Sequence, residues 1–597
     1  MKAYRTNAMI CTCTNCISNG SLRVKEALEA EISKRGLQND VQVVPTGASG
    51  LCVKGPILIV QPEGIFYQLL TEKDIPHLVE EHFLKGRPVE SLMYVAAGEK
   101  MPIPKMKDIP FFKNQRLIAL RNRGVIDPDK IEEYIARDGY KALAKVLTSM
   151  TPEQVIEELK ASGLRGRGGA GFPTGSKWEF CRKSTETPKY IICNADEGDP
   201  GAFMDRSIIE ADPHSVIEGM VIGAYAMGGS YGYIYIRIEY PLAIERMTLA
   251  IDQAREYGLL GKDIFGSGFN FDISVFRGAG AFVCGEETSL IASIEGRYPE
   301  PRIRPPFPAQ SGLWGKPTNI NNVETWANVP VIINWGAKWF AEIGTETSKG
   351  TKVFSLAGNI NNAGLVEVPM GITLRQIVYD IGGGIPKEKK LKAVQTGGPS
   401  GGFIPSELLD LPVDYDRLQE AGAIMGSGGM IVVDENSCIV DMAKYFLNFT
   451  RDESCGRCTT CREGIAAMYD IVTDICNGKG KPEHIRLLED LSEAVKDASL
   501  CALGGTAPNP VLTTLRHFRD EYEIHINEKR CPAGVCRALI HYRVDPEKCT
   551  GCMACNKQCP GQAIVGKPKE PQIIDEEKCI KCGVCLETCK FEAVLVE

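Results

Sequence analysis

The sequence lacks the features that would place the chain in a membrane, outside the cell or on nucleic acid. It has no run of about 18 apolar residues, which a transmembrane helix would need. No apolar signal core follows the start of the chain, so we expect a cytoplasmic protein that is neither secreted nor inserted in a membrane. The net charge of -8 gives no reason to expect a nucleic-acid partner. A hydrophobic fraction of 44% and a charged fraction of 24% exclude a disordered, collagen-like or coiled-coil chain.

Cysteine is the one residue type present in excess. The 597 residues contain 23 cysteines, and the length suffices for roughly three to five domains that each bury a core. In a chain that is not expected to be secreted, so many thiols indicate metal or redox chemistry rather than disulfides. We expect Cys181, Cys193, Cys284 and Cys438, which stand alone, to be ordinary core or loop residues.

The last eight cysteines form two copies of one pattern with a period of 30 residues. Each copy has the spacing C-x2-C-x2-C-x3-C, which is typical of bacterial two-cluster ferredoxins, where the fourth cysteine of each run ligates the other run's cluster. A pair of zinc knuckles is the alternative. The pattern predicts two 4Fe–4S clusters, one on Cys549, Cys552, Cys555 and Cys589 and one on Cys579, Cys582, Cys585 and Cys559.

A shorter run, Cys455, Cys458 and Cys461, has the spacing C-x2-C-x2-C. Three thiolates do not complete a four-iron cluster, so a distant fourth ligand is needed, and Cys501 is the best candidate. Helix-forming sequence in 440–475 and 483–525 predicts a small helical bundle with the cluster at its end. A zinc site is the alternative here too.

Three further cysteines and a histidine suit a structural zinc ion. They are Cys476, His525, Cys531 and Cys536. Three thiolates and one imidazole make a closed tetrahedral set, which would clamp the bundle to the segment that leads into the ferredoxin. His541 is an alternative to His525, and unliganded core cysteines are the alternative to a site.

The stretch from Gly163 to Trp178 is rich in glycine, and we expect it to be neither a packed helix nor a strand. Glycine lets backbone N–H groups approach a phosphate, which Arg165, Arg167 and Lys177 would neutralise. The stretch has neither the Walker nor the G-x-G-x-x-G pattern, and its composition is equally compatible with an irregular loop. Three polar stretches add amides and carboxylates that suit a flat isoalloxazine with ribityl hydroxyls: 194–201, 278–287 and 321–325.

These stretches, with 304–308 and the run 453–464, closely resemble the NADH-binding flavoprotein subunit of respiratory complex I between about residues 115 and 525. Two further parts of the chain, the N-terminal segment and the ferredoxin-type end, indicate a narrower family. The whole chain resembles the beta subunit of cytoplasmic electron-bifurcating hydrogenases.

The resemblance implies a set of binding residues and no catalytic side chain, because the flavin carries the chemistry. It implies NADH stacked near Phe172 and Phe307, with Glu287 and Glu197 close to its riboses. Glu287 would repel a 2′-phosphate, so we expect NAD(H) rather than NADP(H). It also implies the 4Fe–4S cluster on Cys455, Cys458, Cys461 and Cys501. The residues that would hold FMN are Gly166, Arg167, Gly168, Lys177, Asn194, Asp196, Glu197, Gly285, Glu286, Asn321 and Asn322.

The N-terminal segment departs from the family pattern. The family has a thioredoxin-like 2Fe–2S domain with C-x4-C followed by C-x3-C. Here Cys11 and Cys16 form the first pair and Cys52 ends the second, but Ala48 stands where the fourth cysteine belongs. Either Cys13 substitutes as a ligand or the cluster is absent, and we favour substitution because one new thiol compensates for one lost.

Together these observations predict a multidomain α/β and α+β protein. The predicted parts are a thioredoxin-like 2Fe–2S domain (1–95), an α/β FMN and NAD domain (111–345), a β-grasp module of the soluble-ligand-binding type (350–440), a helical 4Fe–4S domain with the zinc site (441–545) and a two-cluster ferredoxin domain (546–597). A proline- and lysine-rich linker, 101–110, ends the first domain. The expected cofactors are FMN, NAD(H), three 4Fe–4S clusters, one 2Fe–2S cluster if Cys13 substitutes, and one zinc ion.

We expect a subunit that exchanges electrons between NADH, iron–sulfur clusters and ferredoxin in an electron-bifurcating hydrogenase complex. Its partners would be a small 2Fe–2S subunit, a large iron–sulfur hydrogenase subunit and ferredoxin. The alternatives are a diaphorase subunit of an NAD-dependent formate dehydrogenase or of a flavin-based transhydrogenase, and an electron-transfer scaffold without nucleotide chemistry. The chain has no hydrogenase active-site motif, because the ferredoxin spacing claims its C-terminal cysteines.

Overall fold

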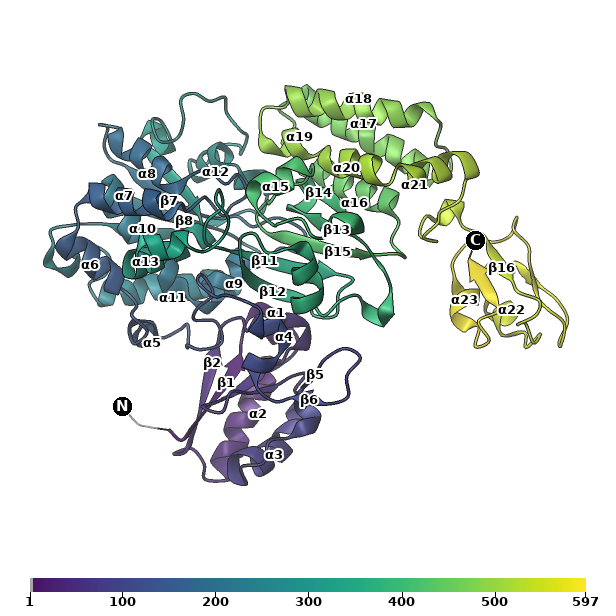
Figure 1. The fold of residues 1–597 in the computed structure, drawn as a ribbon, viewed down its shortest axis with the longest axis horizontal. Helices are drawn as coiled ribbons and strands as arrows, with labels where there is room; N and C mark the ends of the chain where they lie inside the picture. Colours follow the sequence, from purple (N-terminus) through teal and green to yellow (C-terminus); the bar gives the residue numbers. More distant parts are fainter. Residues whose placement is uncertain (1–3, 597) are drawn as a thin grey trace. The chain divides into compact units, whose positions relative to one another are not determined.

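The computed structural model describes residues 4–596 and divides into two compact units, one ending at Val433 and one beginning at Asp434 (Figure 1). Both units are built of several parts, and the first mixes helices with three larger sheets. None of the helices within 4–596 has the length and apolar character that crossing a bilayer requires.

A four-stranded sheet of order β2-β1-β3-β4 begins the first unit, in purple in Figure 1. β1 pairs in parallel with β2 and antiparallel with β3. The elements are β1 (Thr6–Cys11), α2 (Ser21–Lys34), β2 (Val41–Thr46), β3 (Leu58–Gln61) and β4 (Ile65–Tyr67).

The predicted linker 101–110 is a packed segment, so that expectation is wrong. Its strand β6 (Pro102–Ile103) pairs with β5 (Tyr94–Val95), and Lys105 bridges to Ile65 of β4. Ile109 and the following Phe111 are fully buried in a core cluster. Proline and lysine suggested a spacer, but the apolar residues between them anchor the segment.

The second sheet has the order β10-β7-β8-β9, and all of its strands are parallel. Its strands are β7 (Tyr190–Ala195), β8 (Tyr231–Arg237), β9 (Asp272–Gly278) and β10 (Thr318–Asn322). The surrounding helices are α7 (Pro152–Ser162), α8 (Thr174–Lys183), α9 (Met204–Ala211), α10 (Pro213–Met227), α11 (Pro241–Glu256), α12 (Glu287–Ile294) and α13 (Val323–Trp335).

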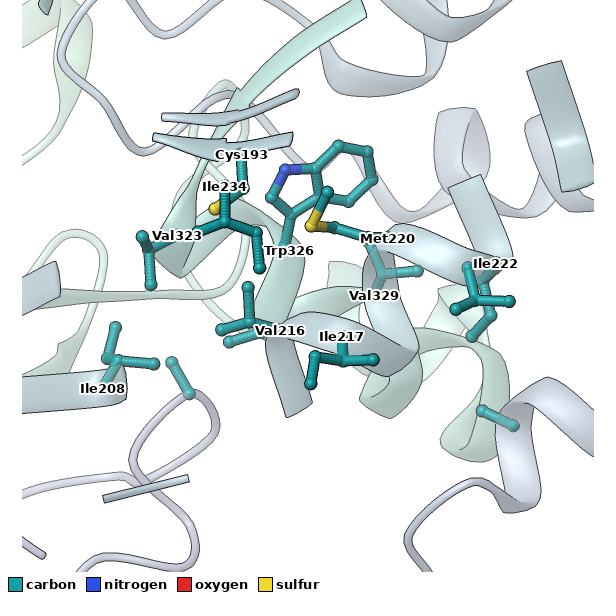
Figure 2. Packing of buried hydrophobic residues seen from close by; sticks show 14 of the residues in the cluster. Cys193, Ile208, Val216, Ile217, Met220, Ile222, Ile234, Val323, Trp326 and Val329 are labelled. Carbon is teal, nitrogen blue, oxygen red and sulfur yellow. The ribbon is translucent and has the colours of Figure 1, made fainter. Parts of the chain in front are cut away.

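Two almost entirely buried helices, α10 and α13, pack against this sheet. Figure 2 shows Trp326 of α13 among Met220 and Val216 of α10 and Cys193 and Ile234 of the strands. Burying an indole ring removes a large apolar area from water, so this packing fixes both helices on the sheet.

The third sheet has the order β12-β11-β15-β13-β14, with β11 and β15 parallel in its middle and an antiparallel pair on each side. The segment predicted as a β-grasp module, 350–440, contains this sheet. One core cluster contains residues of this module, such as Phe354 and Val366, together with Cys11, Cys13 and Leu51 of the N-terminal part, so the two parts share a core. The strands are β11 (Thr351–Gly358), β12 (Gly364–Pro369), β13 (Leu391–Thr396), β14 (Gly402–Pro405) and β15 (Gly429–Asp434).

The second unit begins with helices where the sequence predicts a bundle. α16 packs against α17, and α17 against α18. They are α16 (Ile439–Asp452), α17 (Thr459–Cys476), α18 (Glu483–Ala498), α19 (Ala502–Thr506), α20 (Asn509–His517) and α21 (Arg519–Glu523).

The C-terminal part repeats one small motif twice, as the 30-residue period predicts. Each repeat has a short helix that contains the third cysteine of its run and ends just before the fourth, α22 (Ala554–Gln558) and α23 (Val584–Thr588). The first strand pairs with the last: β16 (Tyr542–Val544) is antiparallel to β19 (Val594–Val596), and β17 (Ile564–Val565) to β18 (Ile573–Ile574).

Candidate functional site

The carboxyl ends of four parallel strands meet at one edge of the β10-β7-β8-β9 sheet. From β7 the chain proceeds through β8 to β9 on one side, whereas β10 lies on the other side, so the strand order reverses between β7 and β10. Open parallel sheets bind ligands at this switch point, beyond the carboxyl ends of their strands. Asn194 of β7 and Asn322 of β10 are paired there, which brings two predicted site residues together.

The glycine-rich loop lies against the same edge. A Cβ atom added to Gly168 would stand 3.1 Å from Cβ of Asn322. Two backbone hydrogen bonds close the loop: Gly166 N–H donates to the carbonyl of Phe172 (2.8 Å), and Thr174 N–H donates to that of Leu164 (2.9 Å). The expectation that no part of this stretch is helical is wrong at its end, because α8 begins at Thr174 once the glycine-dense part has passed.

Arg167 is engaged within the protein. Its fully buried guanidinium donates to the carbonyls of Thr351 (3.0 Å), Lys349 (2.6 Å) and Arg165 (2.8 Å). Its backbone N–H donates to Oγ1 of Thr325 (2.9 Å). This arrangement does not support the predicted contact between Arg167 and a phosphate.

Lys177 forms a charged trio with Glu287 and Arg304. Its ammonium lies 2.9 Å from one carboxylate oxygen of Glu287, and the Arg304 guanidinium lies 2.9 Å from the other. Burial opposes the ionisation of Glu287, but the two cations outweigh it and hold the pKa of this carboxyl below its ordinary value. The trio has a net positive charge, which offsets the repulsion that Glu287 alone would exert on a 2′-phosphate.

Two other carboxylates predicted at the site accept hydrogen bonds from the first turns of helices. Glu197 accepts the backbone N–H groups of Asp205 (3.1 Å) and Arg206 (3.2 Å) in α9, and burial raises its pKa. Glu286 accepts those of Thr288 (2.8 Å) and Ser289 (3.0 Å) in α12. A carboxylate that satisfies free N–H groups stabilises a helix start, so both residues build the loops at the sheet edge.

The asparagine side chains predicted at the site do not all point the same way: two lie among the loops at the sheet edge and one points into the core. Nδ2 of Asn194 donates to the carbonyl of Gly285 (2.9 Å), and its Oδ1 accepts from Asp196 N–H (3.0 Å), which ties three predicted residues together. Asn322 caps α13 through Glu324 N–H (2.9 Å). Because neighbouring strand residues alternate in direction, Asn321 points into the core, where it accepts from Nε1 of Trp178 (2.9 Å).

The two aromatic residues predicted to stack on NADH are accessible. Phe172 is 50% exposed and Phe307 is 52% exposed. Sequence reasoning missed Phe180 of α8, although its ring lies 6.4 Å from that of Phe172 between centroids and is also exposed. Exposed rings of this kind offer faces on which a flat heterocycle stacks.

Two residues of the β-grasp module were missed as well. The hydroxyl of Tyr415 donates to the carbonyl of Gly166 (2.8 Å), and the hydroxyl of Ser427 donates to Asp199. No local motif marks either one, since each acts on a loop more than two hundred residues earlier.

In the helical part of the second unit, Cys501 lies beside the C-x2-C-x2-C run. The backbone N–H of Leu500 donates to Sγ of Cys458 (3.3 Å), and a Cβ added to Gly504 would stand 3.2 Å from that of Cys461. Burial raises the pKa of Cys501, N–H groups of Gly504 and Leu503 oppose the rise, and the charges of Cys455 and Cys461 add to it. This four-thiol donor set fits a 4Fe–4S cluster.

A second thiol set in this unit differs from the predicted one. The ligand atoms of Cys438, His525, Cys531 and Cys536 are buried and lie within 4.8 Å of one another. Cys438, which was expected to be an ordinary core residue, is buried and belongs to this group. Cys476, which was predicted as a ligand, instead lies near Cys536 and Asp441 in a separate group.

The geometry of this set fits a tetrahedral zinc ion. Sγ of Cys438 lies 3.7 Å from Sγ of Cys536, and Zn–S bonds of ~2.3 Å in a tetrahedron require about 3.8 Å. Nε2 of His525 faces Cys438 at 3.3 Å, while its Nδ1 lies 2.7 Å from the carbonyl of Glu521. Zinc-binding histidines typically donate their other N–H in this way. His541, the alternative ligand, instead lies near Glu576 (3.4 Å).

The N-terminal cysteines converge only in part. Cys11, Cys13 and Cys16 are buried with their Sγ atoms within 4.8 Å of one another, and those of Cys11 and Cys13 are 3.5 Å apart. Sγ of Cys52 lies 3.5 Å from the carbonyl of Gly50 and is not in this group. Cys13 therefore lies with the two thiols of the predicted first pair.

The ferredoxin-type part brings Cys559 to the second cysteine run. One cavity is lined by Cys559, Cys579, Cys582 and Cys585, which is the crossed set that the spacing predicts. The two fourth cysteines have equivalent surroundings: Sγ of Cys559 accepts from Ala563 N–H and that of Cys589 from Ala593 N–H, both at 3.3 Å. The donor set fits a 4Fe–4S cluster.

Four segments of the chain match known protein families. Residues 159–331 match the Nuo51 FMN-binding domain, and 353–404 match the SLBB domain. Residues 441–525 match the NADH-ubiquinone oxidoreductase-F iron-sulfur binding region, and 541–590 match a 4Fe-4S dicluster domain.

Relatives extend over most of the chain. The NADP-reducing hydrogenase subunit HndC of Solidesulfovibrio fructosivorans is 59% identical over 459 residues, which cover 77% of this chain and 93% of that protein. An NADH-quinone oxidoreductase subunit of Rhizobium meliloti is 47% identical over 415 residues, 70% of this chain and 99% of that protein. A chain of an NAD+-reducing NiFe hydrogenase superposes with a TM-score of 0.61 at 29% identity, covering 88% of this chain and 84% of that one.

Proposed function

The chain belongs to the family of NADH-binding flavoprotein subunits found in hydrogenases and in NADH-quinone oxidoreductases, and from this premise we propose that it is the NAD(H)-converting subunit of an electron-bifurcating hydrogenase. As a member of that family it is an NADH dehydrogenase-type oxidoreductase subunit that acts within a complex. Beyond the family, we propose the path of the electrons, the set of bound cofactors and the partner subunits.

One observation supports the flavin site above the others. The glycine-rich loop, Asn194 and Asn322 meet at the switch point of the parallel sheet, where open α/β sheets bind nucleotides. We place FMN there, with the backbone of Gly166, Gly168 and Gly285 facing it.

The chain's own residues orient the reactants. Lys177 offers a cation at the start of α8, and the exposed rings of Phe172 and Phe307 offer stacking faces for the coenzyme. A bound flavin supplies the chemistry, since it accepts a hydride from nicotinamide and passes single electrons to iron–sulfur clusters. Positioning and electrostatics are what this chain contributes, so no side chain is needed as a general base.

We propose three 4Fe–4S clusters, one in the helical part and two in the ferredoxin-type part. We propose one zinc ion on Cys438, His525, Cys531 and Cys536, which replaces the set with Cys476. The closed donor set would clamp the helices to the segment leading into the ferredoxin-type part. A 2Fe–2S cluster on Cys11, Cys13, Cys16 and Cys52 completes the proposal and requires the Cys52 side chain to turn toward the other three.

The proposed coenzyme is NAD(H). The NADH-quinone oxidoreductase relatives and the superposed hydrogenase carry NADH and NAD+ in their names, whereas HndC is named for NADP. The charge on Glu287 favours NAD(H), and its two cationic partners weaken that preference.

The proposed partners are a small 2Fe–2S subunit, a large iron–sulfur hydrogenase subunit and ferredoxin. The likeness to hydrogenase subunits favours this assignment over a diaphorase subunit of a formate dehydrogenase or of a transhydrogenase, which would pair the same chain with another terminal reaction.

Steady-state assays of the purified complex test bifurcation. We expect NADH-dependent hydrogen production to require reduced ferredoxin at the same time. NADH oxidation that supports hydrogen production with no need for ferredoxin would show that the bifurcation proposal is wrong. Formate-dependent reduction of NAD+ would favour the formate dehydrogenase assignment.

A further inference from the structure

The β-grasp module holds the tip of the glycine-rich loop. Tyr415, which is 6% exposed and begins helix α15 (Tyr415–Glu420), donates its hydroxyl to the carbonyl of Gly166 at 2.8 Å. Gly166 stands at the entry to the loop tip, because its N–H closes the loop on Phe172. Its carbonyl belongs to the next peptide, Gly166–Arg167, whose N–H donates to Oγ1 of Thr325 at 2.9 Å. The hydrogen bonds from Tyr415 and to Thr325 therefore fix the plane of this peptide from both sides.

The Tyr415 ring sets the shape of the loop as well. Gly171 has a φ of +64°, and a Cβ atom there would stand 2.7 Å from the ring, so no other residue fits between loop and ring. The ring also contacts Arg165, whose guanidinium carbon lies 4.4 Å from the centroid of the Tyr415 ring. Arg165 also donates to the carbonyl of Gly171 at 2.6 Å, which joins both ends of the loop across Tyr415.

The module also contacts the second flavin-side loop, which follows β7. Ser427 donates to the carboxylate of Asp199, and Ser355 of β11 donates to the carbonyl of Gly201 at 2.6 Å. A Cβ atom on Gly398 would stand 2.6 Å from the Asp199 carboxylate. The glycine-rich turns of the module at 397–402 and 426–429 are therefore packed against the flavin-side loops.

We propose that Tyr415 and Ser427 are positioning residues of the flavin site, and that the β-grasp module serves as a fixed support for the two flavin-side loops. Neither residue is placed in contact with the cofactor. Each acts through a loop, Tyr415 through Gly166 and Ser427 through Asp199. The inference rests on the proposed function, because it takes the glycine-rich loop as the flavin's binding loop.

The test measures FMN affinity in the full-length chain after removal and re-addition of FMN, followed by quenching of flavin fluorescence. Tyr415→Phe keeps the ring and removes the hydroxyl, so we expect the FMN dissociation constant to rise about three- to tenfold, as one lost hydrogen bond predicts. Ser427→Ala should raise it in the same range. The matched control is Tyr379→Phe, which removes a hydroxyl from a tyrosine of the same module that is 41% exposed.

Two further readouts separate positioning from folding. We expect the thermal midpoint of Tyr415→Phe to stay close to that of Tyr379→Phe, and the flavin midpoint potential to shift only in the former. Unchanged FMN affinity and potential in both Tyr415→Phe and Ser427→Ala would overturn the inference while leaving the proposed function intact. A wild-type chain that binds no FMN would overturn both. If Tyr415→Phe does not fold, Ser427→Ala decides alone.

Discussion

Sγ of Cys438 lies 3.3 Å from Nε2 of His525, although 87 residues separate them in the chain. The backbone N–H of Asp441 supports the same sulfur at 3.5 Å, because Cys438 caps α16. Amide donors to a sulfur stabilise its thiolate form, which is the form that binds a metal. On this basis we propose Cys438 as the residue that completes the set with Cys531 and Cys536.

Zinc content after single substitutions tests this assignment. Cys438→Ser should lower zinc from about one ion per chain to near zero, whereas Cys476→Ser should retain it, and iron content should stay unchanged in both. Elemental analysis of the anaerobically purified chain measures both metals. Loss of zinc in Cys476→Ser with retention in Cys438→Ser would restore the set predicted from the sequence.

The N-terminal thiols offer a second test. Because Cys13 lies with Cys11 and Cys16 and no cysteine stands at Ala48, Cys13→Ser should abolish the 2Fe–2S electron paramagnetic resonance signal of the reduced chain. Cys181→Ser, which removes a buried thiol far along the sequence, is the control and should leave the signal intact. A signal that survives Cys13→Ser would exclude Cys13 as the substitute ligand.

Coenzyme choice depends on the trio of Lys177, Glu287 and Arg304. Glu287→Gln removes the one negative charge and leaves two cations, which attract a 2′-phosphate. We expect the ratio of kcat/KM for NADPH to that for NADH to rise about tenfold, which corresponds to roughly 1.4 kcal/mol. Initial rates with an artificial acceptor measure it, with Glu295→Gln in the same unit as control. An unchanged ratio would show that the coenzyme's adenosine ribose binds elsewhere.

The contact between Asp199 and Ser427 predicts a dependence of stability on pH. Burial raises the pKa of Asp199 from 3.8 to about 6, against the opposing effect of the Ser427 hydroxyl. The native state therefore holds more protons than the unfolded chain between these values, so this group's contribution to stability falls as pH rises toward 6 and stays low above it.

Asp199→Asn keeps the shape of the protonated carboxyl and removes the titration. We expect the thermal midpoint of this variant to exceed that of the wild type at pH 7.5 and to approach it at pH 4.5. Asp380→Asn, at an exposed position, should show the same difference from the wild type at both pH values. If the two variants behave alike, Asp199 is ionised at no cost in the native state.

The sequence located the thiols that bind through local spacing and missed those that depend on the fold. A C-x2-C run places its ligands within a few residues of one another, so Cys455, Cys458 and Cys461 needed only a fourth ligand, for which Cys501 was the candidate. Cys438 and Cys476 look alike as isolated cysteines. Only the packing of α16 against the segment after α21 distinguishes them.

At the proposed flavin site, too, the sequence predicted the local features and missed the contacts that depend on the fold. Glycine content marked the loop at Gly166 and Gly168, because close approach of a backbone has a compositional signature. Composition gave no sign that the Arg167 guanidinium turns inward to the carbonyls of Lys349 and Thr351. It also gave no sign that Tyr415 supports the loop, since both contacts arise from the docking of the β-grasp module.

We propose that this chain binds a flavin at the switch point and reduces it with NADH. Anaerobic titration of the purified chain with NADH, followed by flavin absorbance near 450 nm, tests it most directly. We expect about one FMN per chain and bleaching of its absorbance by NADH, at more than one equivalent because the iron–sulfur clusters of the same chain also accept electrons. A chain that carries no flavin after reconstitution, or whose flavin is not bleached by NADH or NADPH, would contradict it.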